Sequence, residues 1–166
     1  MQPLAPEHIV VTDAGPLMAL GRQDLIGLLS QVFTRAMVPR VVLDECLRHP
    51  QLNDAQRIQA AVSAGTLSVI DGAPALLPEL DPGECAAIGC ALHHHAALLV
   101  DDLAARRQAS ALGLQVIGTP GVLVLAKRRG LIPLVGPLVH DMRAGGHYLS
   151  DAALKAVLQA AGEESQ

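Results

Sequence analysis

Aromatic residues are almost missing from this sequence of 166 residues, which has no tryptophan, one tyrosine and one phenylalanine. Domains of the RNP and OB types bind single-stranded nucleic acid by stacking several bases on aromatic side chains. With only Phe33 and Tyr148 available, the chain cannot build such a platform. The composition therefore excludes these modes of recognition.

Long hydrophobic runs are also missing, because no segment approaches the roughly 18 apolar residues that a membrane-spanning helix needs. Residues 1–7 show neither the basic nor the apolar region of a secretory signal. The three cysteines, Cys46, Cys85 and Cys90, are an odd number and match no zinc-binding spacing. We therefore expect reduced thiols, a cytoplasmic location and no membrane partner.

Basic residues are few: the chain has 12 Lys and Arg against 16 Asp and Glu, which gives a net charge of -4. This balance does not favour nucleic-acid binding by the whole surface, which would need local groups of cations instead. Hydrophobic residues make up 51% of the chain, enough for a sizeable core. The length suits one domain, 1–166, with a core at about 8–161 and a polar tail, 162–166, that we expect to fray.

Short apolar strands alternate with helical patterns along the chain. A helix is expected to have Pro16 at its first position and to break at Gly21. Strands are expected at 8–12, 37–38, 66–70, 97–100 and 115–117, and further helices at 41–47, 53–64, 82–93, 103–112, 119–129, 133–143 and 151–161. The alternation predicts an α/β fold with a mainly parallel sheet covered on both faces.

Acidic residues follow two of these strands: Asp13 ends the first, and Asp101 and Asp102 follow the strand at 97–100. Ligands of open parallel sheets bind outside the carboxyl ends of the strands. A single such aspartate is ordinarily a turn residue. Two strand ends with acids favour function, because neighbouring carboxylates repel each other unless a cation neutralises them. Oxygen ligands without cysteine indicate Mg²⁺ or Mn²⁺.

Two glutamates on helices leave alternatives open. Glu45, taken alone, is explained as a solvated surface charge, as is Asp44 beside it. Glu84 belongs to the sequence Asp81-Pro82-Gly83-Glu84, which has the pattern of a helix-capping box. The spacing alone does not decide between a cap and a metal ligand at Glu84.

The motifs taken together resemble the PIN-domain family, which includes the VapC-like toxin ribonucleases. The resemblance covers nearly the whole chain, and its order and spacing are more specific than any single piece. A later stretch, from Gly118-Thr119-Pro120 to Ile132-Pro133, is similar to one bacterial branch of PIN-like proteins. The residues that carry the family resemblance are Val11-Thr12-Asp13-Ala14-Gly15-Pro16-Leu17, Pro39-x-Val41-x-x-x-Glu45, Gly83-Glu84-x-x-Ala87-Ile88 and Val100-Asp101-Asp102-x-x-Ala105-Arg106.

This resemblance implies a three-layer α/β/α domain with a Mg²⁺- or Mn²⁺-dependent endoribonuclease site. It implies an acidic quartet of Asp13, Glu45, Glu84 and Asp101, with Asp102 as an auxiliary or substitute metal ligand. It also implies that the protein is the toxin of a toxin–antitoxin pair, with a small antitoxin partner, and that it forms a homodimer. The chain departs from the pattern at Glu84, where many members have Asp, and at Gly15, where Ser or Thr is frequent.

The chemistry agrees with those residue types, since divalent ions held by carboxylates can hydrolyse a phosphodiester without a side-chain nucleophile. Arg106 and Arg107, just after the acids at 101–102, are the candidate RNA-binding cations, and Arg106 could instead orient a carboxylate. Lys127, Arg128 and Arg129 fit the C-terminus of a helix, as do His93–His95, which cannot all face one ion. The alternatives are a PIN-like fold that binds RNA or protein without cutting, and a receiver-like phosphoacceptor domain.

Overall fold

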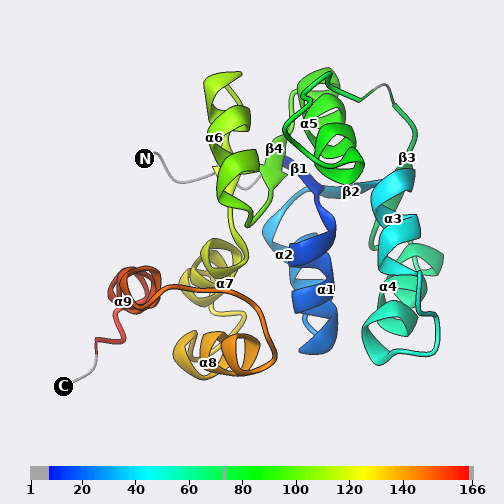
Figure 1. Ribbon diagram of the computed structural model, residues 1–166. Coiled ribbons are helices and arrows are strands. Elements are labelled where there is room, and N and C mark those ends of the chain that lie inside the picture. The colour runs from blue at the N-terminus through cyan, green and yellow to red at the C-terminus, as the bar shows by residue number, and fades with distance from the viewer. Residues whose placement is uncertain (1–7, 73, 165–166) are drawn as a thin grey trace.

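Five parallel strands form the central sheet in the computed structural model, which describes residues 8–72 and 74–164 (Figure 1). Their order is β3-β2-β1-β4-β5, and all four pairings are parallel. The strands are β1 (Ile9–Thr12), β2 (Arg35–Pro39), β3 (Ser68–Ile70), β4 (Ala97–Leu99) and β5 (Val116–Ile117). The predicted α/β fold with a parallel sheet is therefore confirmed. Each expected strand is present, and its bounds differ from the expected ones by a few residues at most.

Nine helices connect and follow the strands in the described chain. They are α1 (Ala14–Arg22), α2 (Gly27–Val32), α3 (Arg40–Cys46), α4 (Asn53–Ser63), α5 (Pro82–His94), α6 (Leu103–Ala111), α7 (Thr119–Arg128), α8 (Gly136–Ala144) and α9 (Asp151–Ala160). The described part of the chain contains no helix of the length and hydropathy that a membrane span requires.

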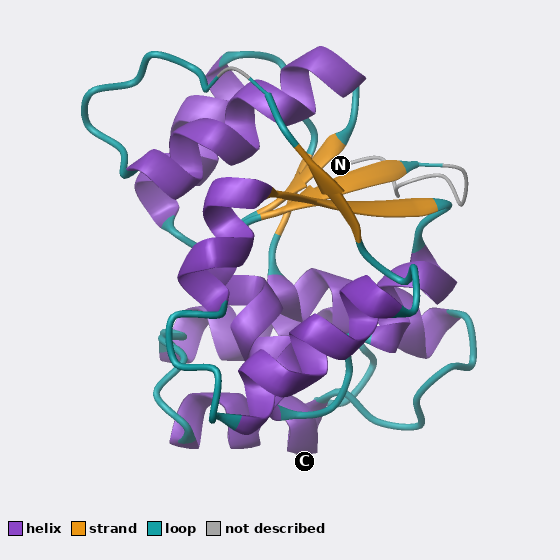
Figure 2. Ribbon diagram, turned by 90° about the vertical axis from the view of Figure 1, so that its right-hand side faces the viewer, coloured by secondary structure: helices purple, strands orange, loops and turns teal. Residues whose placement is uncertain are grey.

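The alternation of side chains in β1 shows how the sheet is covered on both faces. Val10 packs into a core that includes residues of α1, α2 and α7, and Val11 packs into a second core with residues of α5 and α6. Both side chains are fully buried. Neighbouring residues of a strand point to opposite faces, so the two cores lie on the two sides of the sheet. Figure 2 shows the resulting layers of helix, sheet and helix.

The strand order places a reversal at β1, which has β2 on one side and β4 on the other. The chain moves outward from β1 through β2 to β3, and then returns to the other side of β1 for β4 and β5. Ligand sites of open parallel sheets lie outside the strand ends at such a reversal. Residues that directly follow β1 and β4 therefore flank the favoured position.

Two expectations about the first helix are wrong. The helix begins at Ala14, so Pro16 is its third residue, which is allowed because the first four N–H groups of a helix have no internal partner. Gly21 does not break the helix but lies inside it, where a Cβ would be 3.2 Å from Cβ of Asp54 on α4. The glycine permits close packing of the two helices. Arg57 then accounts for the helix end at Arg22, since it donates to the carbonyls of Gly21 and Arg22.

The expected C-terminal helix boundaries and the frayed tail also need correction. The helix expected from Pro133 begins three residues later, at Gly136. Its start is fixed by Glu163, whose carboxylate accepts from the N–H groups of Val135 at 2.8 Å and Gly136 at 3.0 Å. Lys127 adds an ion pair to Glu163 at 2.9 Å. The tail is therefore anchored at Glu163; residues 165–166, like residues 1–7, lie outside the described chain.

Candidate functional site

Asp13 stands at the carboxyl end of β1 and is buried, with 8% of its surface exposed. Its backbone N–H continues the strand pairing by donating to the carbonyl of Leu99 at 2.9 Å. Asp13 is at the N-cap position of α1, but its side chain makes no capping hydrogen bond. The carboxylate is held at the strand end by the sheet, and the adjacent Ala14 N–H is the backbone group that favours its charged form.

Carboxylates from three elements converge on Gly83, in the first turn of α5. A Cβ at Gly83 would lie 3.1 Å from Oε2 of Glu45, 3.4 Å from Oδ1 of Asp81 and 3.7 Å from Oδ1 of Asp13. Glu45 is on α3, Asp81 precedes α5, and Asp13 follows β1. Any side chain at Gly83 would have to displace some of these oxygens, so the glycine allows the acids to come together.

Burial and like charges raise the pKa of Asp13 to about 7, from an ordinary value of 3.8. Loss of hydration is the largest cause, and the charges of Asp81, Glu84 and Glu45 add to it, against a smaller opposite effect of the Ala14 N–H group. Within residues 8–72 and 74–164, no lysine or arginine forms an ion pair with Asp13, Glu45 or Glu84. These three carboxylates therefore have no lysine or arginine ion-pair partner in that part of the chain.

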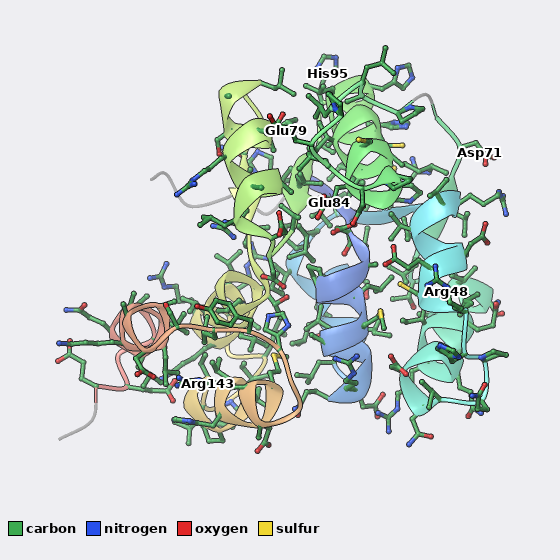
Figure 3. The ribbon with its side chains drawn as sticks, in the orientation of Figure 1. Arg48, Asp71, Glu79, Glu84, His95 and Arg143 are labelled. Carbon is green, nitrogen blue, oxygen red and sulfur yellow. The ribbon has the colours of Figure 1, made fainter. Side chains whose placement is uncertain are left out.

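Glu84 forms the capping box that its sequence indicates. Its N–H donates to Oδ1 of Asp81 at 2.7 Å, and its own Oε2 accepts from the Asp81 N–H at 3.1 Å. Burial, followed by the charges of Asp81, Asp102 and Glu45, raises the pKa of Glu84, although the Asp81 N–H works against the shift. Glu84 is therefore both a cap and a member of the group of acids. Figure 3 shows it at the end of α5 that lies beside α1.

Asp101 follows β4, and its carboxylate is hydrogen-bonded to Thr119, the first residue of α7. Its Oδ1 accepts from the Thr119 N–H at 2.7 Å and its Oδ2 from the Thr119 hydroxyl at 2.5 Å. Oδ2 also lies 3.3 Å from Nε2 of His147, which comes from the loop between α8 and α9. The structure thus places Asp101 in a separate polar group with Thr119 and His147.

Asp102 is exposed and caps α6 by accepting from the Ala105 N–H at 2.9 Å. Its charge contributes to the raised pKa of Glu84, whereas that of Asp101 does not figure among the causes. We call Asp13, Glu45, Asp81, Glu84 and Asp102 the acidic cluster. Of the residues implied as metal ligands or catalytic groups, four belong to it, and Asp101 lies beside it.

The two candidate RNA-binding arginines differ in their surroundings. Arg106 is half-buried and donates through Nη1 to the carbonyl of Val100 at 3.2 Å. A Cβ at Gly118 would lie 2.6 Å from that Nη1 and 3.0 Å from Oδ1 of Asp101, so Gly118 makes room for both groups. Arg106 forms no ion pair with Asp101 or Asp102 in the described chain. Arg107 is exposed.

The donor chemistry of the acidic cluster fits a divalent cation, since it offers carboxylate oxygens and an uncompensated negative charge. No set of three His, Cys, Asp or Glu side chains within the described ranges is arranged as a complete group of metal ligands. The residues present therefore match a hard cation in type and charge. A groove of about 470 Å³ opens beside the cluster. Val41 and Glu45 of α3 and Arg48 just after it contribute to its lining, as do Asp81 and Gly83 at the start of α5.

The histidine run at the other end of α5 is not part of the site. His93 and His94 end the helix, and His95 follows it with a left-handed backbone (φ 52°). A helix of 13 residues is about 20 Å long at about 1.5 Å per residue, so its two ends cannot share an ion. Figure 3 shows His95 and Glu84 at opposite ends of the helix. The assignment of these histidines to a helix C-terminus is confirmed.

Sequence reasoning missed three polar residues of this region: Asp81, Thr119 and His147. Asp81 was assigned to capping alone, although its carboxylate also faces the cluster. Thr119 lies two residues after β5 and begins α7, so the strand-end rule that selects the aspartates could have selected it too. His147 follows a helix and precedes another, and no local pattern of the sequence connects it with Asp101.

Comparison with known proteins agrees with this architecture. Residues 9–163 match the model of the DUF3368 family, described as a PIN domain. The chain belongs to this family of PIN domains, which are typically metal-dependent nucleases. The predicted family membership is thereby confirmed. No curated protein matches the sequence.

One solved structure adds support for the fold, and a second shows a weaker likeness. A PilT N-terminus domain protein from the archaeon Sulfolobus solfataricus P2 superposes with a TM-score of 0.50 at 15% identity, over 86% of this chain and 99% of that one. A domain of a functionally unknown protein from Methanocaldococcus jannaschii DSM 2661 gives a TM-score of 0.45 at 14% identity, over 67% of this chain and 90% of that one. At such identities the likeness to the first structure concerns the fold alone.

Proposed function

We propose that the protein is a Mg²⁺- or Mn²⁺-dependent endoribonuclease that hydrolyses phosphodiester bonds in RNA. The observation that carries the proposal is the convergence of Asp13, Glu45 and Asp81 around Gly83, with Asp13 buried and its pKa raised to about 7. Such a group is unfavourable unless a cation offsets it. It lies at the strand ends where ligands of parallel sheets bind, in a chain of a typically nucleolytic family.

Asp13, Glu84 and Asp102 are the residues that would hold the cation, with Asp101 as a further ligand. A bound divalent ion supplies positive charge to the phosphate and lowers the pKa of a bound water. Glu45 is exposed at the groove and is the carboxylate best placed to accept a proton from a water molecule there. Thr119 fixes the orientation of Asp101 through two hydrogen bonds.

Cations at the edge of the site would bind the RNA backbone. Arg107 and Arg48 are exposed, and Arg48 lines the groove beside the acidic cluster. Arg106 already donates to the Val100 carbonyl through one nitrogen. Because a guanidinium group carries five N–H donors, Arg106 can keep this bond and still contact a phosphate.

The proposal extends to a biological role as the toxin of a toxin–antitoxin pair. It is supported by the resemblance of the motifs to the PIN-domain family, which includes the VapC-like toxin ribonucleases. A small antitoxin protein and a second copy of the chain are the expected protein partners. Induced expression should then arrest bacterial growth, and expression of the Asp13→Asn variant should not.

Cleavage of RNA by the purified protein tests the enzymatic proposal. Single-stranded RNA should be cut in the presence of Mg²⁺ or Mn²⁺ and remain intact in EDTA. The Asp13→Asn variant should be inactive but folded, as judged by circular dichroism. As a matched control, Asp141→Asn changes an exposed carboxylate on α8 and should retain wild-type activity. RNA that stays intact with wild type and either metal would refute the proposal.

A second candidate function, binding of RNA or protein without cleavage, is favoured by two observations. Glu84 uses its Oε2 in the capping box, and Asp101 is bound to Thr119. If these hydrogen bonds hold both carboxylates away from a cation, the site cannot assemble. Mg²⁺ would then leave the melting temperature unchanged, whereas an assembled site would raise it by mass action.

A further inference from the structure

The single tyrosine of the chain is unusually exposed. Tyr148 has 87% of its surface accessible to solvent, whereas the single phenylalanine, Phe33, has 2%. Tyr148 lies in the loop between α8 and α9, next to His147. An aromatic ring that takes no part in the core has an apolar face available for a ligand.

The backbone on the N-terminal side of Tyr148 is held by a well-defined turn. After α8 the chain reverses at Gly146, which has a left-handed backbone (φ 99°). The His147 N–H donates to the Met142 carbonyl at 3.0 Å, and the Gly146 N–H donates to that of Arg143 at 3.2 Å. These two bonds are those of a Schellman motif, which ends a helix and sets the direction of the following residues.

Side chains on both sides of Tyr148 complete its placement. His147, of which 13% is exposed, lies 3.3 Å from Asp101 through Nε2 and Oδ2. Beyond the loop, Ser150 caps α9 by accepting from the Ala153 N–H at 3.1 Å, and Arg143 pairs with Asp151 across the loop. Figure 1 shows this connection passing across α7 on its way to α9, and Figure 3 labels Arg143 on α8.

The result is an exposed ring whose neighbour in sequence is in contact with a site aspartate. Consecutive Cα atoms are about 3.8 Å apart, so the anchoring of His147 keeps the backbone of Tyr148 close to Asp101. His147 is held to Asp101 by a contact of 3.3 Å, whereas the ring of Tyr148 remains in solvent. An aromatic surface is thus presented at the margin of the proposed active site.

We propose that Tyr148 stacks on a base of single-stranded RNA whose backbone lies at the acidic cluster; this rests on the proposed function. Every base has a π-face, so one exposed ring can bind RNA with little sequence preference. The acidic cluster and the net charge of -4 repel phosphates. An uncharged base is the part of the strand that can contact this margin without that repulsion. A single ring differs from the multi-aromatic platforms that the composition excludes.

The composition of the chain allows the contact between Tyr148 and a base to be measured directly by tyrosine fluorescence. Because there is no tryptophan, the tyrosine emission of the protein comes from Tyr148 alone. A short single-stranded oligoadenylate with a fluorescein label is titrated in EDTA, and its binding is followed by anisotropy. An unlabelled oligoadenylate of the same length is titrated in parallel, and the tyrosine emission is recorded. Stacking should quench the emission with the same Kd that anisotropy gives. Binding without quenching would overturn the proposal.

Variants separate stacking from other roles of the ring. Tyr148→Ala should raise Kd in EDTA and KM for cleavage about fivefold or more, while kcat stays within about twofold and Tyr148→Phe remains close to wild type. Leu76→Ala, at a side chain 93% exposed in the loop before α5, is the matched control and should leave both constants unchanged.

Three further outcomes would overturn the proposal. The first is cleavage by wild type with an unchanged Kd and KM in Tyr148→Ala, which would leave the ribonuclease proposal intact. The second is an unchanged Kd together with the loss of a dimer in sedimentation, which would make Tyr148 part of an interface between copies. The third is an absence of both RNA binding and cleavage by wild type, which would refute the proposed function as well.

Discussion

Replacement of Asp13 by asparagine should stabilise the metal-free protein at neutral and alkaline pH. The carboxylate is buried with 8% exposure, makes no capping bond to α1, and is repelled by Asp81, Glu84 and Glu45, against the partial effect of the Ala14 N–H. Asparagine has nearly the same shape and carries no charge. The substitution therefore removes the electrostatic cost of ionising residue 13 while it leaves the packing of the strand end in place.

The magnitude follows from the pKa of Asp13, which is raised from 3.8 to about 7. A raised carboxyl pKa means that the native state binds the proton more tightly than the unfolded state, so stability falls as pH rises between about 4 and 7. A shift of about three pKa units corresponds to about 4 kcal/mol at most. Burial of the asparagine amide offsets part of this gain, so we expect a net gain of about 2 kcal/mol above pH 7.

Denaturant unfolding in EDTA at about pH 5 and about pH 8 measures the effect. The gain in Asp13→Asn should be larger at the higher pH by about 3 kcal/mol, because about two pH units of the titration lie between the two conditions. Asp141→Asn, at an exposed carboxylate on α8, is the control and should show no such dependence on pH. An Asp13→Asn variant that is destabilised by the same amount at both pH values would refute the reasoning.

Three further predictions concern the site and its support. Glu84→Gln keeps the capping box, because glutamine also serves at that position, but it removes the charge of a proposed metal ligand. Mg²⁺-dependent cleavage should fall at least about tenfold, while the melting temperature in EDTA stays the same or rises, because burial and neighbouring acids disfavour the charge of Glu84; full activity would remove Glu84 from the site. Arg106→Ala should weaken cleavage, and a shallower salt dependence of RNA binding would show a phosphate contact, whereas an unchanged slope would indicate that Arg106 acts through the Val100 carbonyl. Glu163→Ala removes a carboxylate whose pKa is lowered, against the effect of burial, by the Val135 and Gly136 N–H groups and Lys127. The substitution should destabilise the fold by about 1–3 kcal/mol without changing kcat. An unaltered unfolding midpoint would contradict the role of Glu163 in fixing the start of α8.

The arrangement of the sheet could be predicted from the sequence because its signals are local. The β-branched run before Asp13, the capping pattern at Asp81–Glu84 and the glycines that end helices each act over a few residues. The errors occurred where tertiary contacts decide. Gly21 stays helical because α4 packs against it, and Arg57, which is distant in sequence, binds the carbonyls that end α1.

The candidate site could be predicted in part for the same reason. Strand ends select Asp13, Asp101 and Asp102, and the structure places each of them at that edge of the sheet. The sequence does not show that Asp101 is bound to Thr119 and His147, since these contacts join the end of β4 to α7 and to the loop after α8. Whether the predicted acids hold a metal stays a prediction.

The acids of the cluster differ in whether their carboxylates stabilise the fold by capping a helix. Asp81, Glu84 and Asp102 accept backbone N–H groups at the starts of α5 and α6, so they would stabilise these helices in any protein. Asp13 makes no capping bond to α1, is buried, and has its pKa raised to about 7. Its charge costs stability in the metal-free chain, because the Ala14 N–H offsets only part of the effect of burial and of the neighbouring carboxylates. Asp13 is therefore the residue whose acidity is best explained by a cation bound to the folded protein, and the strongest single reason to place the active site at the end of β1.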